Sequence, residues 1–221
     1  MHQARWFLPK LLLLALSLAV VVPTAKADSF SFTGNFTVDD QLQLFHFTIG
    51  TTFDVVFQTW SWAGGVNADG MTIPSGGFDT VLSLFNSAGK LVDFVDDVGC
   101  TSVVNVDPAT GRCFDAYDSL ELQAGTYTIV LTQYDNLPVG PNLSNGFTRQ
   151  GQGNFTRVFG NCSQFGDTLG DCRSGHWAVD IVGANSATAV PEPSSLALVA
   201  TGVVSFGAWR ALLTNAKLSR S

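Results

Sequence analysis

A period of two in the hydrophobic pattern restricts this chain more than any other feature of its sequence. In residues 124–135, Tyr127, Ile129 and Leu131 alternate with threonines and Val130. Such alternation is typical of a β-strand with one buried face. Between the two ends of the chain, no stretch of ten or more residues carries the i, i+3, i+4, i+7 pattern of an amphipathic helix.

Further strand-like runs cover residues 30–38, 41–50, 51–62 and 176–183, and residues 79–97 indicate a hairpin that turns at Asn86-Ser87-Ala88-Gly89. Gly, Asn, Asp and Pro separate the runs, as expected for turns. Residues 136–175 are rich in Gly and Asn and are expected to form a long loop region. Short strands without helices favour an all-β fold, an antiparallel β-sandwich or barrel.

The N-terminus has the organisation of a signal peptide. Two basic residues precede an apolar segment, residues 11–22, and residues 25–27 (Ala-Lys-Ala) match the small-x-small cleavage pattern. We therefore expect residues 1–27 to be removed and the mature chain to start at Asp28. The alternative is a retained membrane anchor, but twelve apolar residues are few for a transmembrane helix.

The region between residues 28 and 189 is strongly acidic. It holds five basic residues against seventeen acidic ones, which is a formal charge of −12. Phosphate backbones would repel such a surface, so nucleic acid is not an expected partner. The acidic residues are interpreted either as a solubilising surface or as cation ligands.

All four cysteines lie in this acidic region: Cys100, Cys113, Cys162 and Cys172. An even number of cysteines in an exported chain indicates disulfides. Their spacing favours the local pairs Cys100–Cys113 and Cys162–Cys172, each worth roughly 3 kcal/mol in the chain-entropy model. A zinc site is disfavoured because the chain has no C-x₂-C pair and no histidine near the cysteines in sequence.

The C-terminal tail has three parts. Pro191-Glu192-Pro193 interrupts regular structure, and residues 196–213 form an apolar run long enough to nearly span a thin membrane. Basic residues lie near the end of this run and beyond it, at Arg210, Lys217 and Arg220. By the positive-inside rule this end lies in the cytoplasm and the acidic region outside.

This tail resembles the PEP-CTERM sorting signal of Gram-negative bacteria, although the family's tight arginine cluster is spread out here. The resemblance implies that Pro191, Glu192 and Pro193 are recognised by an exosortase, an integral-membrane transpeptidase. It also implies a transient inner-membrane anchor, then delivery to the cell surface or beyond, often alongside exopolysaccharide. An ordinary tail anchor is the alternative.

The region before the tail carries a second resemblance. GNFTVDDQLQLFHFTI, GGFDTVLSLFNSAGKLVDFVDD and LQAGTYTIVLTQYDN resemble an uncharacterised family of secreted bacterial proteins with PEP-CTERM tails. More distantly, they resemble the bacterial pre-peptidase C-terminal domain, a β-sandwich. This implies a jelly-roll-like sandwich without an assigned activity. The expected organisation is therefore a signal peptide (1–27), a β-sandwich domain (28–184), a linker (185–190) and a sorting signal (191–221) with its apolar helix at 196–213.

Calcium is the most defensible ligand. Asp79 precedes one strand of the expected hairpin, Asp96 and Asp97 follow the other, and Asp135 ends a further strand. Hairpin geometry brings Asp79 near Asp96 or Asp97, and carboxylate oxygens suit Ca²⁺. The alternative is that these aspartates are turn residues that bond their own backbone.

Two further patterns are weaker. Trp60 and Trp62 share one strand face in an i, i+2 pair, which is interpreted either as a sugar-stacking platform or as core. His46 and His176 lie in or beside strands, without an HExxH or GxSxG motif. We expect a non-catalytic surface or extracellular-matrix protein with a structural or adhesive role in a biofilm or exopolysaccharide matrix. The alternative is a carbohydrate- or calcium-binding module that acts with a partner enzyme.

Overall fold

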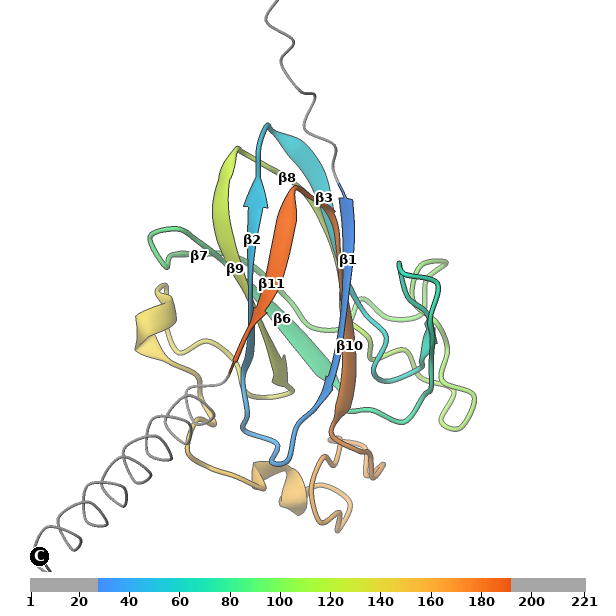
Figure 1. Ribbon diagram of the computed structural model, residues 1–221. Helices are drawn as coiled ribbons and strands as arrows, with labels where there is room; N and C mark the ends of the chain where they lie inside the picture. The colour runs from blue at the N-terminus through green and yellow to red at the C-terminus, as the bar shows by residue number, and fades with distance from the viewer. Residues whose placement is uncertain (1–27, 192–221) are drawn as a thin grey trace, which may run out of the picture.

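The computed structural model describes residues 28–191, and these form two antiparallel β-sheets that pack face to face (Figure 1). The expected signal peptide (1–27) and sorting helix (196–213) lie outside the described residues. Within residues 28–191, no helix has both the length and the apolar character needed to cross a membrane.

The first sheet has four strands in the order β1-β10-β3-β8. Their bounds are β1 Asp28–Asn35, β3 Phe53–Thr59, β8 Tyr117–Leu122 and β10 His176–Ala184. The second sheet has five strands in the order β11-β2-β9-β6-β7. Their bounds are β2 Gln43–Ile49, β6 Thr80–Asn86, β7 Leu91–Val95, β9 Gly125–Gln133 and β11 Ser186–Val190. The all-β antiparallel sandwich and the β6–β7 hairpin are thus confirmed, while the jelly-roll-like description stays a prediction.

The remaining elements are short. A two-stranded ribbon pairs β4 (Gly65–Val66) with β5 (Thr72–Ile73), and the long segment before β10 holds two 3₁₀ helices, η1 (Leu143–Asn145) and η2 (Phe155–Val158). In Figure 1 this segment runs in yellow and orange below and beside the strands. It is a long loop region, as its Gly and Asn content indicates.

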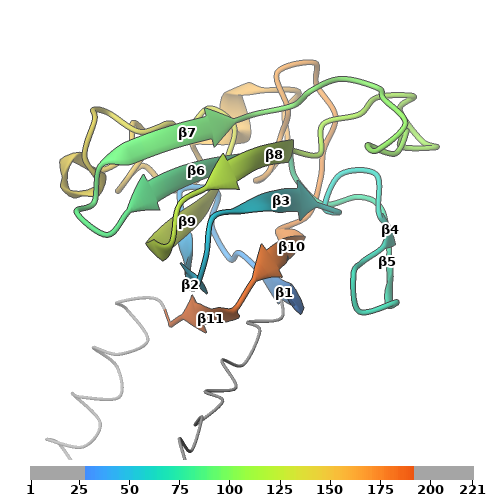
Figure 2. The same ribbon diagram turned by 90° about the horizontal axis from the view of Figure 1, so that it is seen from above.

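The prediction of a linker at residues 185–190 is wrong, because Ser186–Val190 forms strand β11. This strand pairs antiparallel with β2, with Ala187 opposite Phe47 and Val190 opposite Leu44. Its side chains are small or β-branched, and main-chain pairing with β2 needs no large apolar residue. Figure 2 shows β11 close to β1, so this strand lies where the two sheets approach each other.

The core lies between the sheets and is rich in aromatic rings. Phe45, Phe47 and Phe57 are at most 1% exposed, and Trp177 packs edge-on against Phe45. The alternation in β9 correctly predicted its buried face, since Tyr127, Ile129 and Leu131 point into this core. The opposite face of β9 is also covered, because Val130 packs with Phe85 and Phe147 in a second, smaller cluster.

Candidate functional site

Both predicted disulfides are present, Cys100–Cys113 and Cys162–Cys172. Each closes a loop outside the sheets. Among residues 28–191 no cysteine is left free. Paired cysteines fit an extracellular location, because disulfides persist in oxidising compartments.

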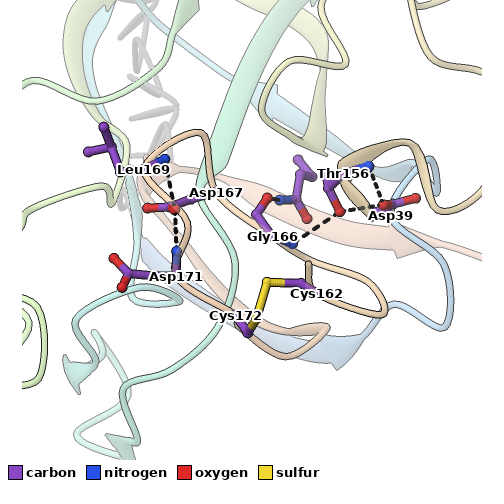
Figure 3. Close-up of a disulfide and its surroundings, with 9 residues drawn as sticks. Asp39, Thr156, Cys162, Gly166, Asp167, Leu169, Asp171 and Cys172 are labelled. Carbon is purple, nitrogen blue, oxygen red and sulfur yellow. Dashed lines mark hydrogen bonds between the residues drawn. A yellow bond between two sulfur atoms is a disulfide. The ribbon is translucent and has the colours of Figure 1, made fainter. Parts of the chain in front are cut away.

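Buried aspartates anchor the loops that the disulfides close. Figure 3 shows this around Cys162–Cys172. Asp39 is fully buried and accepts hydrogen bonds from the backbone N–H of Thr156 at 2.8 Å and from its hydroxyl. Asp167 Oδ1 accepts backbone N–H groups of Leu169 and Asp171 at 3.0 and 2.7 Å. These carboxylates replace the backbone partners that a loop lacks.

Two more buried aspartates, Asp115 and Asp180, hold loop residues in the same way. Asp115 accepts backbone N–H bonds from Ser61, Trp62 and Ala63 at 2.6–3.0 Å. Its burial raises its pKa, and these hydrogen bonds oppose that rise. Asp180 binds the indole N–H of Trp60 at 2.7 Å. These aspartates therefore have a structural role, and their partners occupy the oxygens that a metal would need.

Asp135 does not join the other predicted calcium ligands. Arg149 holds it in a two-bond ion pair, with Nε to Oδ1 at 2.8 Å and Nη2 to Oδ2 at 2.9 Å. The hydrogen bonds from Arg149 lower the pKa of Asp135 despite its partial burial. The predicted role of Asp135 as a calcium ligand therefore finds no support in its surroundings, because a guanidinium already satisfies both oxygens.

Asp79, Asp96 and Asp97 do come together, at the end of the β6–β7 hairpin away from its turn. Asp79 is 5% exposed and its Oδ1 has no hydrogen-bond partner among the described residues; Oδ1 of Asp96 is buried and unpartnered in the same way. Burial, then the negative charges of Asp96 and Asp97, raise the pKa of Asp79 well above its usual range. Burial and Asp97 raise the pKa of Asp96 to about 6.

These acidic side chains lie farther apart than the ligands of a preformed metal site. Within residues 28–191, no three His, Cys, Asp or Glu side chains converge closely enough to hold a metal ion by themselves. Sequence reasoning missed two buried hydroxyls, those of Ser83 and Thr132, which also lack a hydrogen-bond partner in the described part of the chain. The alternation of the strands could have located them, because it places Ser83 and Thr132 on the faces of β6 and β9 that point away from the core.

The interpretation of Trp60 and Trp62 as a sugar-stacking pair is wrong. Trp62 is fully buried, and the guanidinium carbon of Arg173 lies 3.5 Å from its ring centre. Trp60 is half-buried, and a Cβ on Gly65 would lie 2.6 Å from its ring, so the glycine backbone packs directly against that indole. The i, i+2 pattern ends with β3 at Thr59, so the two rings do not share a strand face.

The two strand-associated histidines make ordinary local hydrogen bonds. His46 Nδ1 lies 2.9 Å from the Thr128 hydroxyl on the exposed side of β2. His176 Nδ1 lies 2.6 Å from the Ser174 hydroxyl and Nε2 lies 3.1 Å from the Pro74 carbonyl. Both ring nitrogens of His176 therefore contact groups of the chain itself.

Comparison with known proteins identifies the tail and a distant structural likeness. The PEP-CTERM protein-sorting motif matches residues 189–211, which begin within β11. No curated protein sequence matches the chain. A solved structure, the pre-peptidase C-terminal domain of collagenase from Bacillus anthracis, is similar at 9% identity and a TM-score of 0.32, over 72% of this chain and 89% of that one.

The PEP-CTERM motif implies that the chain belongs to the class of exported proteins sorted by an exosortase. Sorting includes a transient stay at the membrane. The two disulfides agree with a location outside the cytoplasm.

Proposed function

We propose that this protein is a non-catalytic structural or adhesive component of the cell surface or extracellular matrix, associated with exopolysaccharide and delivered there by an exosortase. The observation that carries the proposal is the sorting motif at residues 189–211. Such a motif directs its cargo to the exterior, and the cargo here is a β-sandwich with two disulfides.

The junction between cargo and motif supports delivery of a folded domain. Val190 ends β11 and is held to Gln43 by a hydrogen bond of 2.9 Å from Nε2 to the Val190 carbonyl. The next residue, Pro191, is exposed. Recognition at Pro191 would therefore require no opening of the sandwich.

The composition of the site supports a structural or adhesive role. The aspartates of the loops mostly bind backbone N–H groups or arginines, as Asp39, Asp115 and Asp135 do. Disulfides and buried carboxylates both stiffen irregular segments. A domain with rigid loops and a strongly acidic surface is suited to persist in a hydrated matrix.

The sorting part of the proposal is tested in a host with and without its exosortase. Wild-type protein is compared with a variant in which Pro191, Glu192 and Pro193 are all alanine. We expect wild-type protein at the surface with its tail removed, and the variant retained at the inner membrane with its tail intact. Surface labelling and the mass of the isolated protein report both results. Equal display and equal mass of the two proteins would overturn the proposal.

The matrix part needs a separate measurement. A strain that lacks this protein should retain less exopolysaccharide and form weaker biofilm than the same strain complemented with the wild-type chain. Unchanged biofilm and matrix in the deletion strain would reject a structural or adhesive role.

A further inference from the structure

The outward face of the five-stranded sheet carries a buried polar cluster where β6, β7 and β9 lie side by side. Val81 pairs with Thr132, and the backbone N–H of Tyr134 donates to the Asp79 carbonyl at 3.0 Å. Because alternate residues of a strand share a face, Asp79 lies on the same face as Thr132 and Tyr134. Leu82 pairs with Val95 toward the core, which puts Asp96 on the outward face beside Val81.

Several side chains in this cluster are buried without the hydrogen-bond partners that buried polar groups normally have. Four oxygens on this face are buried without a hydrogen bond from the described residues: Asp79 Oδ1, Ser83 Oγ, Asp96 Oδ1 and Thr132 Oγ1. Thr132 and Ser83 are 0% exposed and Asp79 is 5% exposed. Buried polar groups in folded proteins nearly always have a partner, so the unpartnered carboxylate oxygens of Asp79 and Asp96 point to a bound species.

The charge of the cluster defines that species. Asp79 is surrounded by Asp96 and Asp97, and Asp167 and Asp115 add to the negative field. No basic side chain is among the groups that act on the Asp79 carboxyl. Asp107 differs here, since it is fully buried but has Arg173 as an ion-pair partner at 3.0 Å. A cation therefore fits a place where the protein supplies no positive charge of its own.

We propose that Asp79 and Asp96 bind a divalent cation of the Ca²⁺ class, with water completing the coordination shell. Calcium takes six to eight oxygen ligands in flexible geometry and accepts water among them, so two carboxylates that do not form a tight three-residue cage suit it better than Mg²⁺. Asp97, which is exposed at the same end of the hairpin, supplies further negative charge. This site is independent of the sorting function and of any matrix partner.

The test uses the protein as isolated after export, with Asp79→Asn and Asp96→Asn as site variants. Asp54→Asn is the matched control, because Asp54 is exposed on β3 of the other sheet. Thermal midpoints are measured in EDTA and in increasing CaCl₂. For the wild type and the control, we expect the midpoint to rise with Ca²⁺ and to continue rising with each tenfold increase above saturation. For the site variants, we expect at least tenfold weaker binding and no shift at the concentration that saturates wild type.

A second readout separates ligand loss from misfolding. Without metal, asparagine removes a buried, repelling charge, so Asp79→Asn should fold with a midpoint at or above that of metal-free wild type. Terbium luminescence titrations should show a Ca²⁺-displaceable site in wild type that the variant lacks. The proposal is overturned if Ca²⁺ leaves the wild-type midpoint unchanged, or if the site variants respond to Ca²⁺ as wild type does. Since neither measurement involves an exosortase, failure here would leave the sorting proposal untouched.

Discussion

The guanidinium carbon of Arg173 lies 3.5 Å from the centre of the Trp62 ring. Arg173 also donates from Nη2 to Asp107 at 3.0 Å and to the Trp62 carbonyl at 3.3 Å. Its side chain is 6% exposed and that of Asp107 is fully buried. A single arginine thus ties the segment before β10 to the loop after β3 and to the loop that holds Asp107.

Removal of this arginine should destabilise the domain strongly. Arg173→Met leaves Asp107 as an uncompensated buried charge, so we expect a loss of about 3–5 kcal/mol in the free energy of unfolding. The double variant Arg173→Met, Asp107→Asn should recover much of that loss, since the orphaned charge is gone. Chemical denaturation measures all three proteins. A single variant as stable as wild type, or a double variant no better than the single one, would contradict this assignment.

The disulfides should make separate contributions. Replacement of Cys162 and Cys172 by serine opens a loop with a sequence separation of 10, and the chain-entropy model gives a loss of about 3 kcal/mol. A similar loss is expected for Cys100 and Cys113, with a separation of 13. Because the loops are distinct, the losses should add when all four cysteines are replaced. Denaturation under non-reducing conditions measures this, and wild-type stability in either double variant would refute it.

Truncation should locate the boundary between domain and tail. Deletion of residues 191–221 keeps β11 and should leave the thermal midpoint of the exported domain unchanged. Deletion of residues 185–221 removes the strand that pairs with β2 and should lower the midpoint by at least several degrees. One kcal/mol corresponds to roughly 2–4 °C in a domain of this size. Equal midpoints for the two truncations would mean that β11 adds nothing to stability.

In metal-free buffer, the raised pKa of Asp96 should make the free energy of unfolding fall as the pH rises. Burial and Asp97 raise the pKa of Asp96 to about 6, from an ordinary value of 3.8. Between these values the folded protein binds more protons than the unfolded chain, so the free energy of unfolding decreases as pH rises from about 4 to 6. Asp96→Asn should reduce this decrease, while Asp54→Asn should keep it. Denaturation at several pH values in EDTA tests this, and identical profiles for wild type and Asp96→Asn would exclude it.

Local sequence signals were sufficient for much of the fold. The alternation of Tyr127, Ile129 and Leu131 predicted both β9 and the face that it buries. The hairpin after Asp79 and the pairing of the four cysteines were also predictable, because short connections bring near neighbours in sequence together in space. β8 was not predicted, because only Leu120 and Leu122 alternate with polar residues in Tyr117–Leu122, and so short a pattern does not distinguish a strand from a helical turn.

The candidate site was only partly predictable. Asp79, Asp96 and Asp97 meet because one hairpin connects them. Asp135 is adjacent in the chain to Tyr134 but is bound by Arg149, which comes from the following loop. Such an ion pair depends on how two distant turns meet, and no spacing rule contains that information. The burial of Trp62 against Arg173 has the same origin.

By itself, then, the sequence determined the class of fold, the local disulfides and the Pro-Glu-Pro tail, because period, spacing and short motifs are properties of neighbouring residues. Tertiary structure alone decided that residues 186–190 form an edge strand. It alone decided which aspartates bind backbone amides, and which keep buried oxygens without a partner among the described residues. The physical reason is that the burial and the partners of a side chain depend on segments far away in sequence. A carboxylate has the same intrinsic chemistry at Asp39, Asp135 and Asp79, and only the surrounding donors make it a loop anchor, an ion-pair partner or a buried group with an unpartnered oxygen.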